Sequence, residues 1–454
     1  MKFVIGLITA IGLFVDTMEV YAQMPDENIN KINQEEVIDA VGRLLQERYL
    51  YLDSAEKMNV FLHEAIKSGT YSNATSARGF ARMITNDLLN NFHDKHIRLI
   101  YAPKLAKSLG TNSSNEPSQE EIENELKVEI FENYRLPELR RLEGNIGYLK
   151  IDQFLPPKYA RGYSEKMAAC FEFIGNTNGL IIDLRDNPGG YGDGVGFFLS
   201  YLLPPKTKII EEKYRIPNGG LGQELGFTGT IVEGKPYLDR PIYVLISAQT
   251  ASAAEAVAHV LKYSKRALLV GHTSFGAGYL GDDFPVDENF VLTVSYASQK
   301  HPDAPRNWEG IGLTPDINAS YEEALLIAHT QLLGDLIKLE NDKPKKDRDQ
   351  DRLKQIEWTF QKLKDLQNPI QLDKSILTTY LGQYENRSVI LDDEDLIYQK
   401  AGGPKINLIP VGTDEFLSDK LNYRFKFDRD KTTNQISSLS MSTTDRLFRY
   451  QKTN

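Results

Sequence analysis

"DRPIYVLISAQTASAAEAVAHVLKYSKRALLVG", residues 239–271, contains three elements in a row. Residues 241–247 and 267–271 are short apolar runs with the length of buried strands. Between them, apolar residues recur at helical spacing from 252 to 264. A strand, a helix and a second strand in this order are typical of an α/β domain.

The same alternation extends along the chain on both sides of this stretch. Short strands are also predicted at residues 126–131, 145–151, 179–185 and 290–296. Helical patterns lie between several of these strands, near residues 159–175 and 193–203. The sequence therefore predicts an α/β core built on a mixed sheet.

The two ends of the chain differ from this core. Residues 31–92 contain three helical patterns and predict a small helical bundle, whereas the polar residues 108–125 predict a loop. Residues 320–366 predict a solvated connecting helix because their charges are dense and of both signs. Residues 371–454 contain short strands separated by turn residues and predict an all-β meander or small barrel.

Composition and charge exclude several classes of protein. A formal net charge of −10 over 454 residues argues against nucleic acid or an anionic membrane surface as the main partner. Residues 1–22 have the pattern of a secretory signal peptide, and Asp16 and Glu19 leave its apolar run too short for a membrane span. The single cysteine, Cys170, lies in an apolar helical pattern, so we expect neither a disulfide nor a cysteine-based metal site.

Ser252 has two interpretations at the start of the predicted helix 252–264. With Glu255 three positions later it fits a capping box, in which the serine caps the helix and the glutamate binds back to the serine N–H. Alternatively, Ser252 is a nucleophile, which requires a base, an orienting acid and N–H donors for an oxyanion elsewhere in the chain. In that case Thr250 is available as the cap.

Three further stretches offer those groups. His93 and His96 lie in "NNFHDKHIRLIYAP", at a polar junction between a predicted helix and a strand. Gly189 and Gly190 lie in "GLIIDLRDNPGGYGDG", where a strand ends in a sharp turn and a bare N–H can approach a ligand closely. Glu309 lies in the Gly-rich turn of "NWEGIGLTPDI". Taken singly, each stretch is also compatible with an ordinary surface turn.

Taken together, the stretches resemble the tail-specific serine proteases. "IIDLRDNPGG", "TASAAEAVAHVLK", "GHTSFGAGY" and "WEGIGLTPDI" occur in the order and approximate spacing of that family, which includes the C-terminal processing peptidases, the tricorn core protease and the interphotoreceptor retinoid-binding-protein-like peptidases. "HDKHIRL" resembles the Asp-x-His element of the last group, which follows an N-terminal helical bundle. The resemblance covers roughly residues 30–325 and implies a crotonase-like (ClpP/crotonase) core.

The resemblance also implies roles for particular residues. The processing peptidases use a lysine base, but the corresponding position here is Ala277, which excludes that dyad. The tricorn and retinoid-binding-like branch uses a histidine and a glutamate, although the serine beside the histidine in tricorn is Lys95 here. The implied nucleophile, general base and orienting acid are Ser252, His96 and Glu309, and the implied oxyanion donors are the N–H groups of Ala253 and of Gly190 or Gly189. We expect Glu309 to raise the pKa of the imidazole.

The resulting hypothesis is an exported serine endopeptidase that acts on a peptide or protein substrate, with no metal or organic cofactor. The expected parts are a signal peptide, a helical bundle, a protease core, connecting helices and a small β domain, at residues 1–22, 23–100, 101–325, 326–370 and 371–454. Two alternatives stay open: a catalytically inactive relative that binds peptides or lipophilic ligands, and an esterase on the same core.

Overall fold

The structure, a computed structural model, describes residues 28–29, 31–111, 119–157, 161–217, 219–229, 232–418 and 420–453. The chain divides into two compact units, the first formed by Met1–Arg141 and Gly147–Ala324 and the second by Leu142–Ile146 and Leu325–Asn454. The predicted signal peptide lies outside the described residues. Within the described part, no helix has both the length and the apolar character that a membrane span requires.

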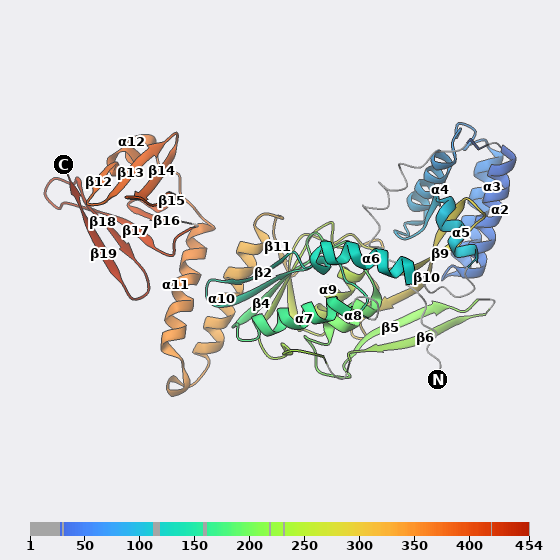
Figure 1. Ribbon diagram of the computed structural model, residues 1–454, viewed down its shortest axis with the longest axis horizontal. Helices are drawn as coiled ribbons and strands as arrows, with labels where there is room; N and C mark the ends of the chain where they lie inside the picture. Colours follow the sequence, from blue (N-terminus) through green and yellow to red (C-terminus); the bar gives the residue numbers. More distant parts are fainter. Residues whose placement is uncertain are drawn as a thin grey trace. The chain divides into compact units, whose positions relative to one another are not determined.

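Three helices at the start of the first unit confirm the predicted helical bundle (Figure 1): α2 (Lys31–Arg48), α3 (Leu52–Lys67) and α4 (Ala77–Phe92). Each helix buries residues spaced three or four apart, as an amphipathic helix does. These side chains form one core cluster with strand residues such as Phe290. The Ser76 side chain caps α4 by accepting a hydrogen bond from the Gly79 N–H at 3.1 Å.

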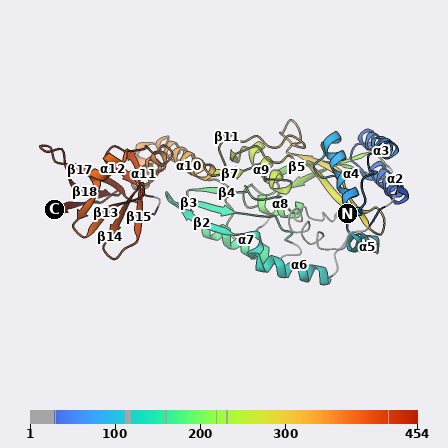
Figure 2. The same cartoon turned by 90° about the horizontal axis from the view of Figure 1, so that it is seen from above.

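The predicted α/β core is confirmed as a six-stranded sheet. Its strands, in spatial order, are β11 (Ile317–Asn318), β8 (Ala267–Gly271), β7 (Ile242–Ile246), β4 (Gly179–Asp183), β3 (Ile146–Lys150) and β2 (Glu138–Leu142). The first four run parallel. Three helices lie next to the sheet (Figures 1 and 2): α7 (Arg161–Ile174), α8 (Gly192–Leu199) and α9 (Ala253–Tyr263). Every residue of β4 and β7 is buried, because helices and sheet share one continuous apolar core.

A second sheet in the same unit is antiparallel. It contains β1 (Arg98–Tyr101), β10 (Phe290–Lys300), β5 (Lys208–Arg215) and β6 (Leu221–Phe227), and β9 (Tyr279–Pro285) pairs with β10. Strand β1 follows α4 after five residues, so the sheet holds the segment 93–97 between the bundle and β10. This segment carries both histidines of the Asp-x-His element.

The polar segment before the core was predicted wrongly. Residues 126–131, predicted as a strand, and most of the C-terminal part of the predicted loop 108–125 form helix α6 (Gln119–Phe131). Helix α5 (Pro103–Thr111) also extends into the predicted loop. The sequence of α6 contains five glutamates, which favour a helix, but it lacks the apolar stripe by which helices are recognised.

The second unit consists of helices and a closed β-barrel. Helices α10 (Ala324–Asn341) and α11 (Gln350–Leu366) replace the single predicted connecting helix, with Pro344 between them. The barrel confirms the predicted all-β region and closes by pairing its first and last strands. Its eight strands follow one another in sequence order: β12 (Gly382–Tyr384), β13 (Arg387–Asp392), β14 (Asp395–Lys400), β15 (Lys405–Gly412), β16 (Glu415–Leu417), β17 (Arg424–Arg429), β18 (Ile436–Ser442) and β19 (Leu447–Thr453).

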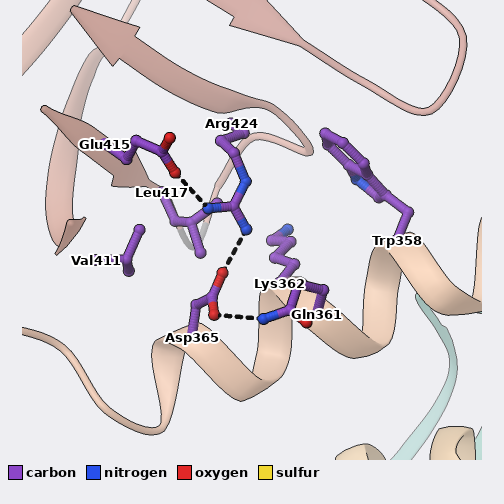
Figure 3. Close-up of a pocket in the computed structure, with 8 residues that line it drawn as sticks. All are labelled: Trp358, Gln361, Lys362, Asp365, Val411, Glu415, Leu417 and Arg424. Carbon is purple, nitrogen blue, oxygen red and sulfur yellow. Dashed lines mark hydrogen bonds and ion pairs between the residues drawn. The ribbon is translucent and has the colours of Figure 1, made fainter.

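A cavity of about 390 Å³ lies between α11 and the barrel within this unit (Figure 3). Figure 3 shows Arg424 between Asp365 and Glu415, and both carboxylates are paired with its guanidinium. Lys362, which also lines the cavity, is paired with Glu143 at 2.8 Å. The charged side chains that line the cavity are therefore committed to internal ion pairs.

Candidate active site

Ser252 lies in the turn between β7 and α9, in an unusual backbone conformation. Its φ is 50° and its ψ is −116°, and the residue is 6% exposed. Ser76, the cap of α4, has the extended conformation that is normal for a cap, with φ −123° and ψ 151°. The capping box predicted from Ser252 and Glu255 is present, but an ordinary cap does not need this strained backbone. Strain of this kind is concentrated at functional sites.

The turn before Ser252 is fixed from both sides. The Thr250 hydroxyl donates to the Leu184 carbonyl at 2.7 Å and accepts from the Ser247 N–H at 2.9 Å. Thr250 therefore holds the turn to the end of β4 and does not take over the capping of α9. The Ala251 N–H donates to the Asn187 carbonyl at 3.1 Å, which ties the turn to the Gly-Gly loop.

Gly189 and Gly190 lie beside this turn, and both have a φ of 130°. A Cβ at Gly189 would lie 2.9 Å from the Cβ of Ser252, and a Cβ at Gly190 would lie 2.2 Å from the Phe154 carbonyl oxygen. Both positions therefore require glycine. The structure thus brings the predicted oxyanion loop against the predicted nucleophile.

The two glycines differ in the use of their N–H groups. The Gly189 N–H donates to the Asn187 side-chain oxygen at 2.8 Å. No hydrogen bond from the Gly190 N–H is recorded among the described residues. Ala253 is the first residue of α9, so its N–H also has no partner within the helix. Gly190 and Ala253 therefore retain the N–H groups that an oxyanion requires, and Gly189 does not.

Glu255 connects the Ser252 turn with the loop 274–279. One carboxylate oxygen accepts from the Ser252 N–H at 2.9 Å and from the Ala277 N–H at 2.8 Å. The other oxygen accepts from the Ser274 hydroxyl at 2.5 Å and from the Gly276 N–H at 2.7 Å. A glutamate that only caps its helix needs the bond from the Ser252 N–H. It does not need the three bonds from the loop 274–279.

We expect Glu255→Gln to weaken both the fold and the site. An amide nitrogen cannot accept, so two of the four donors would lose their partner, at about 1–3 kcal/mol for each buried group. The Ser252 turn and the loop 274–279 would also no longer be held in position relative to each other. We therefore expect kcat to fall by about 100-fold. Thermal unfolding and peptide hydrolysis measure the two effects. Glu322→Gln, at an exposed position, is the matched control; equal results for both variants would contradict the role of Glu255.

His96 and Glu309 lie together, as the resemblance implies. The His96 Nδ1 atom is 3.9 Å from the Glu309 Oε2 atom, and His96 is 2% exposed. The Asp94 carboxylate holds the His96 segment, because its Oδ1 atom accepts from the His96 N–H at 2.8 Å and from the Ile97 N–H at 3.2 Å. Where the tricorn relative has a serine, the main-chain N–H of Lys95 donates to Glu309 at 2.9 Å.

Glu309 is held by the far half of the same loop that Glu255 binds. The Gly278 and Tyr279 N–H groups donate to its Oε2 atom at 2.5 and 2.9 Å. The loop 274–279 therefore donates to Glu255 from one half and to Glu309 from the other. In this way the structure connects the Ser252–Gly189 pair with the His96–Glu309 pair through one short segment of main chain.

The electrostatics of the pair differ from the sequence prediction. Burial lowers the pKa of the His96 imidazole to about 4, so the predicted increase is wrong: loss of hydration outweighs the nearby carboxylates. Burial raises the pKa of Glu309 to about 7, and the Asp94 charge adds to this effect. Near neutral pH the imidazole is thus a neutral acceptor, and Glu309 is the group that titrates.

The other histidines of the first unit are placed differently. His259 is buried on α9 with its ring 4.6 Å from that of Tyr263 and 4.5 Å from that of Trp308, so it belongs to the core. His93 is exposed and ends α4 in the left-handed conformation, with a φ of 59°. His301 accepts from the Asp303 N–H in a turn. None of these side chains has the contacts of His96.

Sequence analysis missed four residues that position the site: Asp94, Asn187, Glu255 in its loop-binding role, and Asn307. Asn307 accepts from the Glu309 N–H at 2.6 Å and donates to the Gly278 carbonyl at 2.6 Å. Arg185 and Asp183, which lie next to the Gly-Gly loop in sequence, form a buried pair at 2.6 Å. These residues could have been predicted from the short polar side chains next to the motif residues, because such side chains bind the main chain of turns.

Comparison with known proteins supports the family resemblance. The sequence model of peptidase family S41 matches residues 145–319, and that of the N-terminal domain of S41 peptidases in the eukaryotic interphotoreceptor retinoid-binding protein matches residues 30–132. The predicted resemblance is confirmed, because residues 145–319 match peptidase family S41, and this similarity indicates a serine-type peptidase.

Two curated relatives illustrate the similarity. The carboxy-terminal-processing protease of Bartonella bacilliformis is 32% identical over 39% of this chain and 39% of the relative. The carboxyl-terminal-processing protease of a Synechocystis species is 31% identical over 38% of this chain and 37% of the relative. The match thus spans about two fifths of the length of these relatives.

The chain is also similar in part to solved structures, with TM-scores below 0.5. A lipoprotein from Streptococcus agalactiae has a TM-score of 0.47 and 16% identity, over 68% of this chain and 98% of that chain. The photosystem II D1 C-terminal processing protease has a TM-score of 0.41 and 14% identity, over 64% and 94%.

Proposed function

We propose that the protein is an exported serine endopeptidase in which Ser252 attacks the peptide carbonyl. The observation that supports this most is the loop 274–279, which binds the carboxylate beside the nucleophile and the carboxylate beside the base. A structural turn needs only one such contact. Six consecutive residues bind both the Glu255 and the Glu309 carboxylates. This arrangement fits a site in which the nucleophile and the base must be held at a fixed distance.

In the proposed reaction His96 accepts the Ser252 proton as the oxygen attacks. An imidazole with a lowered pKa is in its neutral form at neutral pH, as a general base must be. The imidazolium that forms is then stabilised by the ionised Glu309, whose Oε2 atom lies 3.9 Å away. His96 returns the proton to the leaving amine, and water completes hydrolysis of the acyl-enzyme.

The negative charge of the tetrahedral intermediate falls on the carbonyl oxygen. The N–H groups of Gly190 and Ala253 have no other acceptor among the described residues, and Ala253 stands at the N-terminal end of α9, where the helix dipole favours an anion. Arg185 takes no part, because its guanidinium is bound by Asp183. Export rests on the signal-peptide pattern of residues 1–22.

A fluorophosphonate probe tests the nucleophile directly. We expect the probe to label the wild-type protein and not the Ser252→Ala variant. Matched peptide and ester substrates then separate a peptidase from an esterase. A wild-type protein that the probe does not label would favour the alternative of a binding protein without turnover.

We expect Glu309→Gln to reduce the rate by about 100- to 1000-fold, the cost of removing one electrostatic contact to the transition state. This loss is smaller than that from removal of the nucleophile, because the base and the oxyanion donors remain. The wild-type rate should rise with pH through the Glu309 pKa, about 7, as the carboxylate forms. The variant should lack this rise.

The measurement is kcat/KM from pH 5 to 9 for wild type, Glu309→Gln and the exposed-site control Glu288→Gln. The control should follow the wild-type profile. A Glu309→Gln variant with the full rate and an unchanged profile would mean that Glu309 only holds the turn.

A further inference from the structure

Asp94, His96 and Glu309 form a cluster of three possible metal ligands. The proposed proton transfer needs only His96 and Glu309. One ligand atom of each residue lies within 4.8 Å of the other two. Neither imidazole nitrogen of His96 has a hydrogen-bond partner within the described chain, and the same is true of the Asp94 Oδ2 atom. All three atoms are buried. Buried polar atoms without partners are uncommon, and one cause is an ion that is not part of the protein.

The carboxylates are held in place by main-chain bonds, and the Asp94 Oδ2 and Glu309 Oε1 atoms accept the fewest of them. The Asp94 Oδ1 atom takes the main-chain bonds of the His96 segment and a bond from the Ser295 hydroxyl at 2.9 Å, which leaves Oδ2 open. Glu309 is held by three main-chain N–H groups. Support of this kind fixes metal-binding carboxylates in known sites. Tyr49 lies near Asp94, and burial, followed by the Asp94 charge and a side-chain hydrogen bond with Asp94, raises the pKa of its hydroxyl.

The donor set selects the kind of ion. One imidazole nitrogen with two carboxylate oxygens suits Zn²⁺, whereas Ca²⁺ and Mg²⁺ take oxygen ligands alone. Bonds of about 2.0–2.2 Å to a tetrahedral zinc place neighbouring ligand atoms about 3.4 Å apart. The Nδ1–Oε2 distance is 3.9 Å and the three ligand atoms lie within 4.8 Å of one another, so the side chains must move closer together to bind the ion. Neither carboxylate has a Lys or Arg ion pair recorded in the described residues, so the ion would supply the missing positive charge.

We propose that Asp94, His96 and Glu309 bind a zinc ion that reversibly inhibits the peptidase. This inference rests on the proposed function of His96. A neutral imidazole has one proton and one lone pair, so an ion on either nitrogen leaves the proton on the other. No nitrogen then remains to accept the Ser252 proton. The zinc ion and the serine proton compete for the same lone pair, and removal of the ion restores activity.

Binding is measured first, on the Ser252→Ala variant of the full chain, so that turnover plays no part. Titration with ZnCl₂ by calorimetry should give one site, and Co²⁺ should give the intense visible absorption of a tetrahedral complex. Adding Asp94→Asn preserves an oxygen for the Oδ1 contacts and replaces the open Oδ2 with an amide nitrogen. We expect the affinity to fall at least about tenfold. Thermal unfolding verifies that the variant is folded.

Two histidine variants serve as controls in the same background. His93→Asn lies three residues from His96 and preserves a residue that tolerates the left-handed backbone. His63→Gln removes the exposed His63–Asp39 pair, the obvious surface site for a stray ion. Both controls should bind Zn²⁺ like the parent. Loss of binding in a control, or unchanged binding in Asp94→Asn, would overturn the site.

Inhibition is measured separately on the wild-type protein. Saturating Zn²⁺ should abolish peptide hydrolysis, and EDTA should restore it. Full activity with the site occupied would overturn the inhibitory role. A wild-type protein that binds Zn²⁺ but cleaves no peptide would contradict the proposed function, whereas an active protein that binds no Zn²⁺ would contradict only the zinc site.

Discussion

Ser252→Ala should abolish peptide hydrolysis while leaving the protein folded. The substitution removes the oxygen that forms the acyl-enzyme, and loss of a serine nucleophile costs about 10⁶-fold in kcat where such residues act as a unit. The cost to stability is about 1 kcal/mol, the usual cost of losing a cap. The main-chain bond from residue 252 to Glu255 does not depend on the side chain. Peptide hydrolysis and thermal unfolding, measured on the same preparation, separate the two effects.

Ser76→Ala provides the matched control. Ser76 also stands at the start of a helix, and its hydroxyl accepts from the Gly79 N–H at 3.1 Å. Its removal should lower stability by a similar amount, about 1 kcal/mol, with no change in hydrolysis. Both serines stand at the start of a helix, but only Ser252 has the strained backbone and only Ser252 should be needed for hydrolysis. Unchanged turnover in Ser252→Ala would refute the assignment of the nucleophile.

His96→Ala should reduce hydrolysis by about 10²- to 10⁴-fold, the contribution of a positioned general base. His93→Asn, at an exposed position with a left-handed backbone, should retain the wild-type rate. The wild-type rate should first fall as Glu309 is protonated near pH 7, and the residual rate should then persist to about pH 4, because burial lowers the pKa of the imidazole to about 4. Protonation of His96 below that pH should remove the remaining activity.

The rate against pH, from pH 3.5 to 9, tests this assignment for both variants. A His93→Asn protein that is inactive while His96→Ala retains activity would mean that the Asp-x-His element was misaligned. If both variants retained full activity, a lysine base would have to be considered. The structure places the Lys262 ammonium against the Asp316 carboxylate at 2.7 Å, which removes one such candidate.

The fold of this chain was largely predictable because its core strands are buried on both faces. Fully apolar runs such as residues 242–246 have no alternative but to form interior strands. Helix α6 was missed because its stability comes from helix-forming residues without an apolar stripe, a signal that periodicity does not detect. The closed barrel was recognisable from turn residues at regular intervals, which mark strand ends wherever the strands pair.

The site was predictable only as a set of residue types. Order along the chain indicated Ser252, His96 and Glu309, but not the hydrogen bonds that hold them. Asn187 and Asp94 act on neighbouring main-chain atoms, so their roles depend on the local path of the chain. The direction of the His96 pKa shift was also beyond reach, since it depends on how much water is excluded and not on which acids are nearby.

The loop 274–279 binds the two carboxylates in a way that depends on its main chain more than on its side chains. Its contacts with the two carboxylates are made mainly by peptide N–H groups, which every residue except proline provides. Gly276 and Gly278 cannot change, since a Cβ would lie 2.8 Å from the Gly312 nitrogen or 2.2 Å from the Asn307 side-chain oxygen. The residue between them, Ala277, contributes only its N–H to these contacts. A substitution at position 277 that keeps the path of the main chain would therefore leave both carboxylates with the same N–H donors.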